Sequence, residues 1–147
     1  MTLTGTYPRS LDDKRRLAIP KRLKDEFGDP ELGGLYVAPG SDHSLALYSP
    51  QAFDSLAQKI AQQPVNRANV INFKRLFYAR AEKVEFDAQG RIRLPDRLAE
   101  LAGLTRDVVL LGVQDHAEVW DAKVWDDFLS RNGPDFDAIA AAAFENG

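Results

Sequence analysis

The sequence predicts an α+β fold in which two copies of a small β-β-α-β-β unit interleave into one barrel-like domain with pseudo-twofold symmetry. A motif near the N-terminus returns 75 residues later, followed each time by the same series of strand, proline and apolar helix. Four short strands and one helix make a core too small to stand alone, so the two copies are expected to bury each other's faces.

The repeat consists of two segments that align without gaps. Residues 10–23, SLDDKRRLAIPKRL, match residues 85–98, EFDAQGRIRLPDRL. The identities in and just after them are Asp12/Asp87, Arg16/Arg91, Pro20/Pro95, Arg22/Arg97, Leu23/Leu98 and Gly28/Gly103. Further on, Asp42-His43 corresponds to Asp115-His116. Chance is not expected to place turn, strand, helix and Asp-His turn in the same order twice.

Each copy has the residue pattern of the same elements. Alternating polar and apolar residues predict half-buried strands, Gly90 suits a turn that needs positive φ, and a proline suits the first turn of a helix. In the second copy the expected elements are strands at 82–86 and 91–94, a helix opened by Pro95 and closed by Gly103, and strands at 108–113 and 118–120.

Helices are expected between and after the two units. An amphipathic helix over 50–63 ends at Pro64, and Asn66 caps a second helix that is apolar on more than one side. A helix over 122–129 and an alanine-rich tail, helical or frayed, follow. The expected division is unit 1 at 7–53, a helical connection at 54–80, unit 2 at 81–124 and a C-terminal helix or tail at 125–147.

Composition excludes several classes of protein. The 147 residues are 44% hydrophobic and 28% charged, a globular balance, and no apolar run approaches the ~18–20 residues of a membrane span. The absence of cysteine excludes disulfides and thiolate metal sites. We see no signal peptide at the N-terminus, so a cytoplasmic protein is expected.

The charge is unevenly distributed. Residues 7–24 hold seven basic and two acidic side chains, a net charge of +5, which leaves −8 for the rest of a chain whose total is −3. Exposed charges are screened beyond ~8–10 Å, so DNA responds to a local basic patch more than to the total. The alternative for such a run, taken alone, is a solvated loop.

The two motifs, LDDKRRLAIP at 11–20 and FDAQGRIRLP at 86–95, resemble the paired D-x-K/Q-G-R motifs of the MraZ family, within the SpoVT/AbrB swapped-hairpin superfamily. The resemblance runs from about residue 5 to residue 129. It implies SpoVT/AbrB-like units in a double-split β-barrel and a nucleoid-associated transcriptional regulator. Such a regulator binds short direct repeats of double-stranded DNA in its own promoter, ahead of the division and cell-wall genes, and assembles into a closed homo-oligomeric ring.

The resemblance attributes DNA contact to Asp12, Lys14 and Arg16 and, in the second copy, to Asp87, Gln89 and Arg91. Arg15 departs from the motif, because glycine usually stands there, so the first turn is expected either to differ in conformation or to tolerate a strain of ~1 kcal/mol. The full set of expected DNA-binding residues is Arg9, Lys14, Arg15, Arg16, Lys21, Arg22 and Arg91, with Asp12, Asp87 and Gly90 as turn residues. The alternative for Arg16 and Arg91 is an ion pair with Asp12 and Asp87 that pins each turn.

Three other functions are alternatives to a DNA-binding regulator. One is an oligomeric protein-binding scaffold whose basic hairpin face meets an acidic partner, and another is an antitoxin-like superfamily relative. The third, an enzyme using His43 and His116, lacks any metal-ligand or nucleophile motif. We therefore expect no catalytic residue, metal, cofactor, small-molecule substrate or membrane partner. Trp120, Trp125, Tyr48 and Phe53 are interpreted as core or interface aromatics.

Overall fold

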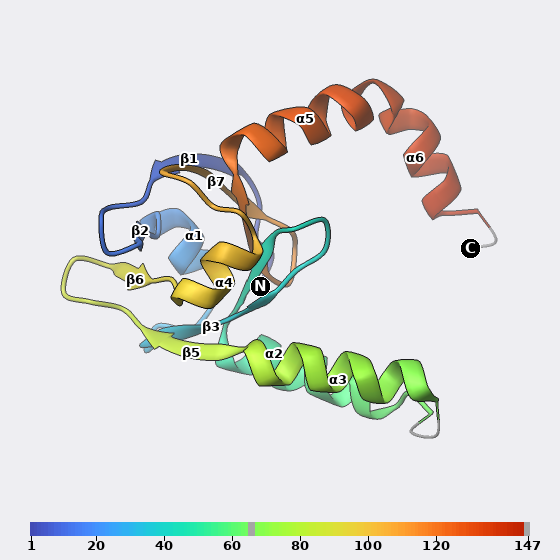
Figure 1. The fold of residues 1–147 in the computed structure, drawn as a ribbon, viewed down its shortest axis with the longest axis horizontal. Helices are drawn as coiled ribbons and strands as arrows, with labels where there is room; N and C mark the ends of the chain where they lie inside the picture. Colours follow the sequence, from blue (N-terminus) through green and yellow to red (C-terminus); the bar gives the residue numbers. More distant parts are fainter. Residues whose placement is uncertain (65–66, 146–147) are drawn as a thin grey trace.

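Two antiparallel sheets form the centre of the fold, and helices project from one side of it (Figure 1). The computed structural model describes residues 1–64 and 67–145. The first half contains β1 (Thr6–Ser10), β2 (Arg16–Ala18), α1 (Lys21–Glu26), β3 (Gly34–Pro39) and β4 (Leu45–Tyr48). The second half contains β5 (Glu82–Glu85), β6 (Arg91–Arg93), α4 (Asp96–Leu101), β7 (Asp107–Gly112) and β8 (Ala117–Asp121). The remaining elements are α2 (Pro50–Ala61), α3 (Ala68–Arg80), α5 (Ala122–Asn132), the 3-10 turn η1 (Gly133–Asp135) and α6 (Phe136–Ala143).

Strands of one half pair with strands of the other. The larger sheet has the order β1-β7-β8-β4-β3-β5, and the smaller consists of β2 and β6. The pairs β1–β7, β4–β8, β3–β5 and β2–β6 each join the two halves, and all are antiparallel. The antiparallel α+β class and the β-β-α-β-β order of each half agree with the prediction. Closure into a double-split barrel stays a prediction.

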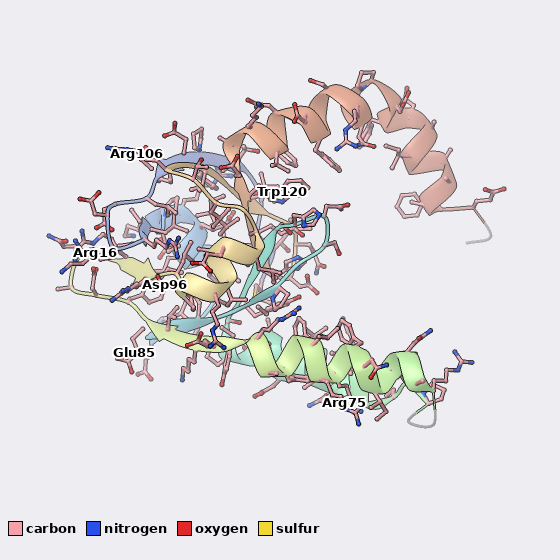
Figure 2. The ribbon with its side chains drawn as sticks, in the orientation of Figure 1. Arg16, Arg75, Glu85, Asp96, Arg106 and Trp120 are labelled. Atoms are coloured by element: carbon pink, nitrogen blue, oxygen red, sulfur yellow. The ribbon has the colours of Figure 1, made fainter. Side chains whose placement is uncertain are left out.

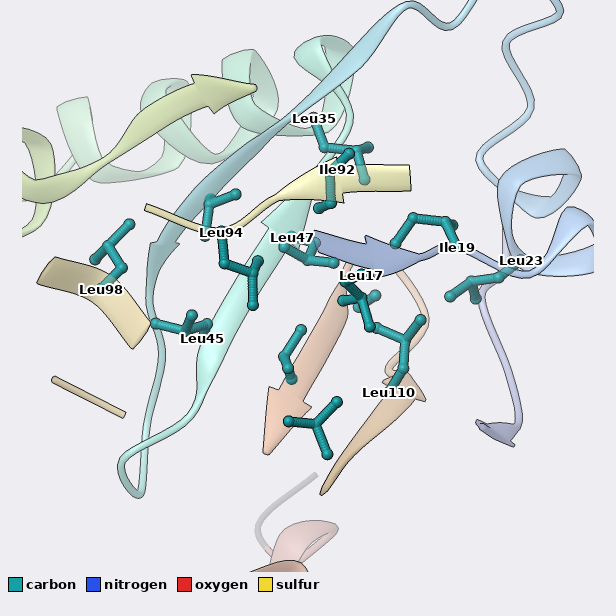
Figure 3. Packing of buried hydrophobic residues seen from close by; sticks show 14 of the residues in the cluster. Leu17, Ile19, Leu23, Leu35, Leu45, Leu47, Ile92, Leu94, Leu98 and Leu110 are labelled. Carbon is teal, nitrogen blue, oxygen red and sulfur yellow. The ribbon is translucent and has the colours of Figure 1, made fainter. Parts of the chain in front are cut away.

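The larger of two hydrophobic clusters lies between the sheets and the short helices (Figure 3). In β2 and β6, Leu17 and Ile92 are partners in register and both have no exposed surface. Buried side chains of the larger sheet meet them, among them Leu35, Leu47 and Leu110. Because every second residue of a strand faces the same side, this core also determines which residues of β2 and β6 face outward.

Two details of the helix boundaries differ from the prediction or lie beyond it. Pro20 and Pro95 are the N-cap residues of α1 and α4 with ψ near 139° and 136°, so each helix begins one residue after its proline. The residue before α3 is Arg67, and the predicted cap Asn66 lies outside the described residues.

Two helical segments project from the side of the sheets opposite β2 and β6 (Figure 1). The α2–α3 pair packs on β3 and β4, and Ser49 caps α2 by accepting a hydrogen bond from the Ala52 amide at 3.1 Å. The α5–α6 segment begins against Trp120, which packs with Trp125 and Phe128. Among the described residues, none of these helices combines the length and hydropathy needed to cross a bilayer.

Truncating Ile92 tests the joint between the halves. We expect Ile92→Ala to lower the free energy of unfolding by about 2–5 kcal/mol, because it leaves a cavity at a fully buried site. Urea unfolding followed by circular dichroism, at fixed protein concentration, measures the loss. Val113→Ala, at a side chain that is 39% exposed, is the control and should change it by about 0.5 kcal/mol or less. An equal loss in both variants would contradict this packing.

Candidate nucleic-acid interface

The pairing of β2 with β6 brings the two copies of the motif side by side. Each strand follows a tight loop, at 11–15 in the first half and 86–90 in the second, and both loops lie at the end of the molecule away from the helical projections (Figure 1). The Leu94 amide donates to the Arg15 carbonyl at 2.9 Å, and the Ile19 amide donates to the Gly90 carbonyl at 3.3 Å. The two loops therefore form one surface, which we call the double-loop face.

A carboxylate organises each loop in the same way. Asp12 Oδ1 accepts hydrogen bonds from the amides of Lys14 and Arg16, both at 2.9 Å. Asp87 Oδ1 accepts from the amides of Gln89 and Arg91 at the same distance. The repeated aspartate is thus the acceptor around which its loop turns.

These hydrogen bonds stabilise the charged form of both aspartates. The Arg16 amide is the main cause that lowers the pKa of Asp12 from 3.8 to about 2, and the Arg16 guanidinium adds to it. The Arg91 amide lowers the pKa of Asp87 for the same reason. At neutral pH both loops therefore contain an ionised acceptor that is already occupied by protein donors.

Arg15 adopts the left-handed backbone conformation that the motif usually assigns to glycine. Its φ is 58°, and φ of Gly90 at the equivalent position is 77°. A side chain in this region costs about 1 kcal/mol relative to glycine. The Arg15 guanidinium offsets part of that cost by donating to Asp96, at 3.1 Å to the carbonyl and 3.2 Å to the carboxylate. The first loop thus keeps the turn of the second and adds a cation.

Three arginines share the outer side of the small sheet. Leu17 and Ile92 face the core, so their neighbours in the two strands face solvent. In register, Arg16 lies opposite Arg93, and Arg91 lies opposite Ala18. Figure 2 shows Arg16 at the free end of the double-loop face. This arrangement brings Arg93 to the face, a residue absent from the predicted set.

Ion pairs hold most of these guanidinium groups. Arg16 contacts the Asp12 carboxylate, and Arg91 contacts Asp87 at 2.8 Å and Asp12 at 3.8 Å. The contact from Arg91 to Asp12 links the two loops directly. A guanidinium carries five N–H donors, so one carboxylate leaves several of them for another acceptor. Within the described residues, Lys14 and Arg93 are exposed and take part in no ion pair.

The other predicted cations lie away from the loops. Arg9 is in β1, where it donates to the Pro8 carbonyl at 2.7 Å. Lys21 and Arg22 are in α1 and pair with Asp25 at 3.1 Å and Glu26 at 3.8 Å. The basic segment 7–24 is therefore divided between a strand, a loop and a helix. Pairing of β2 with β6 assembles Lys14, Arg15, Arg16 and Arg91, but it does not add these three to the loops.

The two histidines of the repeat have different surroundings. His116 Nδ1 lies 2.7 Å from Asp115, Nε2 lies 3.4 Å from Glu118, and the ring stacks on Tyr48. Glu118 is the main cause that raises the pKa of His116. His43 is exposed in the hairpin turn with φ at 61°. In the described part of the chain no cluster of three His, Cys, Asp or Glu side chains could hold a metal ion.

Four aromatic side chains were candidates for stacking on DNA bases, and each of them packs against other aromatic side chains of the chain. Trp120 is buried and packs on Trp125, while Tyr48 and Phe53 lie against each other and the helical projection. Their contacts agree with the interpretation as core or interface aromatics.

Comparison with known proteins gives one consistent result. The family model described as "MraZ protein, putative antitoxin-like" matches residues 2–75 and 77–147. The "Transcriptional regulator MraZ" of Limosilactobacillus fermentum is 37% identical over 137 residues, 93% of each chain. The protein of the same name from Corynebacterium urealyticum is 37% identical over 142 residues, 97% of this chain and 96% of the relative. That of Mycobacterium ulcerans is 36% identical over 139 residues.

The backbone of the second loop provides a test of its turn. A Cβ added at Gly90 would meet no atom within 4 Å, so Gly90→Ala isolates the effect of φ. We expect a loss of about 1 kcal/mol in the free energy of unfolding. Ala88→Gly, in the same loop, controls for chain flexibility. A stability unchanged or raised by Gly90→Ala in thermal unfolding would show that the turn is not left-handed.

The lowered pKa of Asp12 predicts a pH dependence. A group with a lowered folded-state pKa stabilises the fold above its unfolded value and stops doing so as the pH falls through its folded value. Asp12→Asn should therefore be less stable than the wild-type chain at neutral pH, and the gap should close between pH 3.8 and about 2. Asp13→Asn, which removes an exposed neighbouring charge, is the control. A gap that persists at pH 2 in chemical unfolding would contradict the role of Asp12.

Proposed function

This chain belongs to the MraZ family, and we propose that it is a transcriptional regulator that binds double-stranded DNA through the double-loop face. The names of its relatives support the regulatory role. Its own promoter, ahead of division and cell-wall genes, is the site that the family resemblance suggests, and binding there would place it at the nucleoid.

One observation carries the proposal. The outer side of the paired strands β2 and β6 presents Arg16, Arg91 and Arg93, beside the exposed Lys14. Cations on such a face neutralise phosphates and release counterions, which gives salt-dependent affinity. Arginine can also fork onto the O6 and N7 atoms of guanine, which discriminates by about 1–3 kcal/mol between bases.

The paired aspartates explain how an acidic protein could bind DNA in this way. Asp12 and Asp87 are turned toward loop amides and toward arginine side chains. Their charge is thus partly neutralised within the face, whereas Lys14 and Arg93 extend from it. We infer that phosphates are met mainly by Lys14 and Arg93, and base edges by Arg15 and Arg16.

A single face offers few contacts, so we propose that a homo-oligomeric ring presents several of them to successive direct repeats. Linked binding raises the overall affinity by about 10²–10⁴-fold when the geometry permits simultaneous contacts. The units 7–53 and 81–124, which are joined by the pairing of β2 with β6, would then form one DNA-binding surface in each subunit.

Removing unpaired cations tests the face without disturbing the loops. With a fluorescent duplex from upstream of the gene, we expect Lys14→Ala and Arg93→Ala each to weaken binding in anisotropy titrations. Each should also reduce the slope of log K against log salt by about 1. Lys123→Ala, which removes an equal charge from α5, should leave both unchanged. Equal effects in all three variants, or no binding at low salt, would contradict the proposal, and the second result would favour an acidic protein partner.

A charge-conserving variant separates phosphate contact from base readout. Arg93→Lys keeps a point charge but loses the planar fork. If Arg93 meets phosphate, affinity for the specific and a scrambled duplex should both stay near the wild-type values. A selective loss on the specific duplex would instead assign Arg93 to a base.

A further inference from the structure

The C-terminal helix and its C-cap expose large apolar side chains. In and beside α6, Phe136 is 69% exposed, Ile139 47% and Phe144 80%. Phe136 and Ile139 are three residues apart and lie on one side of α6, and Phe144 follows at its C-cap; we call these three side chains the α6 stripe. Isolated exposed apolar residues are ordinary, but a contiguous row of large ones marks an interaction surface.

A second apolar surface lies on the other helical projection. Phe73 and Leu76 of α3 are 48% and 55% exposed. They border a hollow of about 400 Å³ that Tyr48, Leu56, Phe77 and Arg80 also line, which we call the α3 groove. His116 and Glu118 line it as well and are partners of each other. The groove thus has an apolar, aromatic lining with a cation at its border.

The two surfaces have opposite charge. The helix α3 carries Lys74, Arg75 and Arg80 and no acidic residue. The segment 133–145 carries Asp135, Asp137 and Glu145 and no basic residue. Arg80 lines the groove itself, whereas Lys74 and Arg75 lie on other sides of α3, so the helix as a whole carries +3 against −3 for the segment 133–145. Such complementarity steers association and selects the partner surface.

The two surfaces belong to separate projections. In Figure 1, α6 at the red end of the chain stands clear of α2 and α3. A contact between two different surfaces of identical chains is heterologous, and repetition of such a contact gives a closed ring when the rotation allows it. Each subunit would then use its stripe on one neighbour and its groove on the other.

We propose that the α6 stripe of one copy of this chain docks in the α3 groove of the next copy. This inference rests on the proposed ring and specifies the interface between its subunits. Phe136 and Ile139 enter the groove against Phe73 and Leu76, while the neighbouring Asp137 meets Arg80 at the border of the groove. Aromatic anchors seated in a pocket commonly dominate the energy of such interfaces.

Engineered cysteines test the joint directly, because the chain has none of its own. We expect the double variant Leu76→Cys/Ile139→Cys, oxidised in its native state, to give a ladder of linked 16.4 kDa chains on a denaturing gel. The single variants should remain monomeric there. Leu76→Cys/Ala141→Cys is the matched control, because the exposed Ala141 lies on the opposite side of α6 and should not support the ladder.

Light scattering on the same proteins separates the possible failures. A cross-link confined to one chain would show that α6 folds onto its own α3 and would overturn the proposal. Absence of the ladder in a wild-type oligomer would overturn this joint but leave the ring standing. A monomeric wild-type chain would overturn the ring and its joint, whereas DNA binding is judged separately from the anisotropy titrations.

A substitution without cysteine provides an independent check. Ile139→Asp should raise the dissociation constant of the oligomer about tenfold or more, because it places a charge in an apolar contact. Ala141→Asp adds the same charge to the other side of α6 and should leave the dissociation constant within about twofold. Equal effects of the two changes would overturn the proposal.

Discussion

The pairing of β2 with β6 is the constraint on which the rest of the molecule depends. These strands have three residues each, too few to form a stable sheet alone, and they are held by the burial of Leu17 opposite Ile92. That apolar contact joins the halves of the chain at the double-loop face, in addition to the pairs β1–β7, β3–β5 and β4–β8. It also turns the arginines on either side of it outward, so the packing of the core and the placement of the cations have one cause.

Electrostatics within the double-loop face follows from this placement. Bringing Arg16, Arg91 and Arg93 together would be unfavourable if nothing compensated their mutual repulsion. Asp12 accepts two amides from its own loop and contacts Arg16 and Arg91, so a residue needed for the turn also screens the cations. Asp12 therefore shapes its own loop and also reduces the electrostatic repulsion among the neighbouring arginines.

Much of the fold could be predicted from the sequence because the residue pattern of each strand and short helix occurs in both copies of the repeat. The strands, the two short helices and the turn at Gly90 follow from local patterns that the structure confirms. The partner of each strand could not be predicted in this way, since periodicity shows which side of a strand is buried but not which strand lies beside it. Arg93 was missed for this reason. Its equivalent in the first motif is Ala18, and only the register with β2 brings it next to Arg16.

Arg15 shows the opposite case, in which a departure from a motif left two structural outcomes open. Its φ of 58° shows that the chain keeps the glycine-type turn and places a side chain on it. As a result, the two loops share a backbone but differ in what they present, with Lys14-Arg15 on one and Gln89-Gly90 on the other. The two loops thus have the same turn, but one tip is doubly charged and the other is neutral. Each subunit therefore has a polarity, and a partner that touches both tips is held in one direction only.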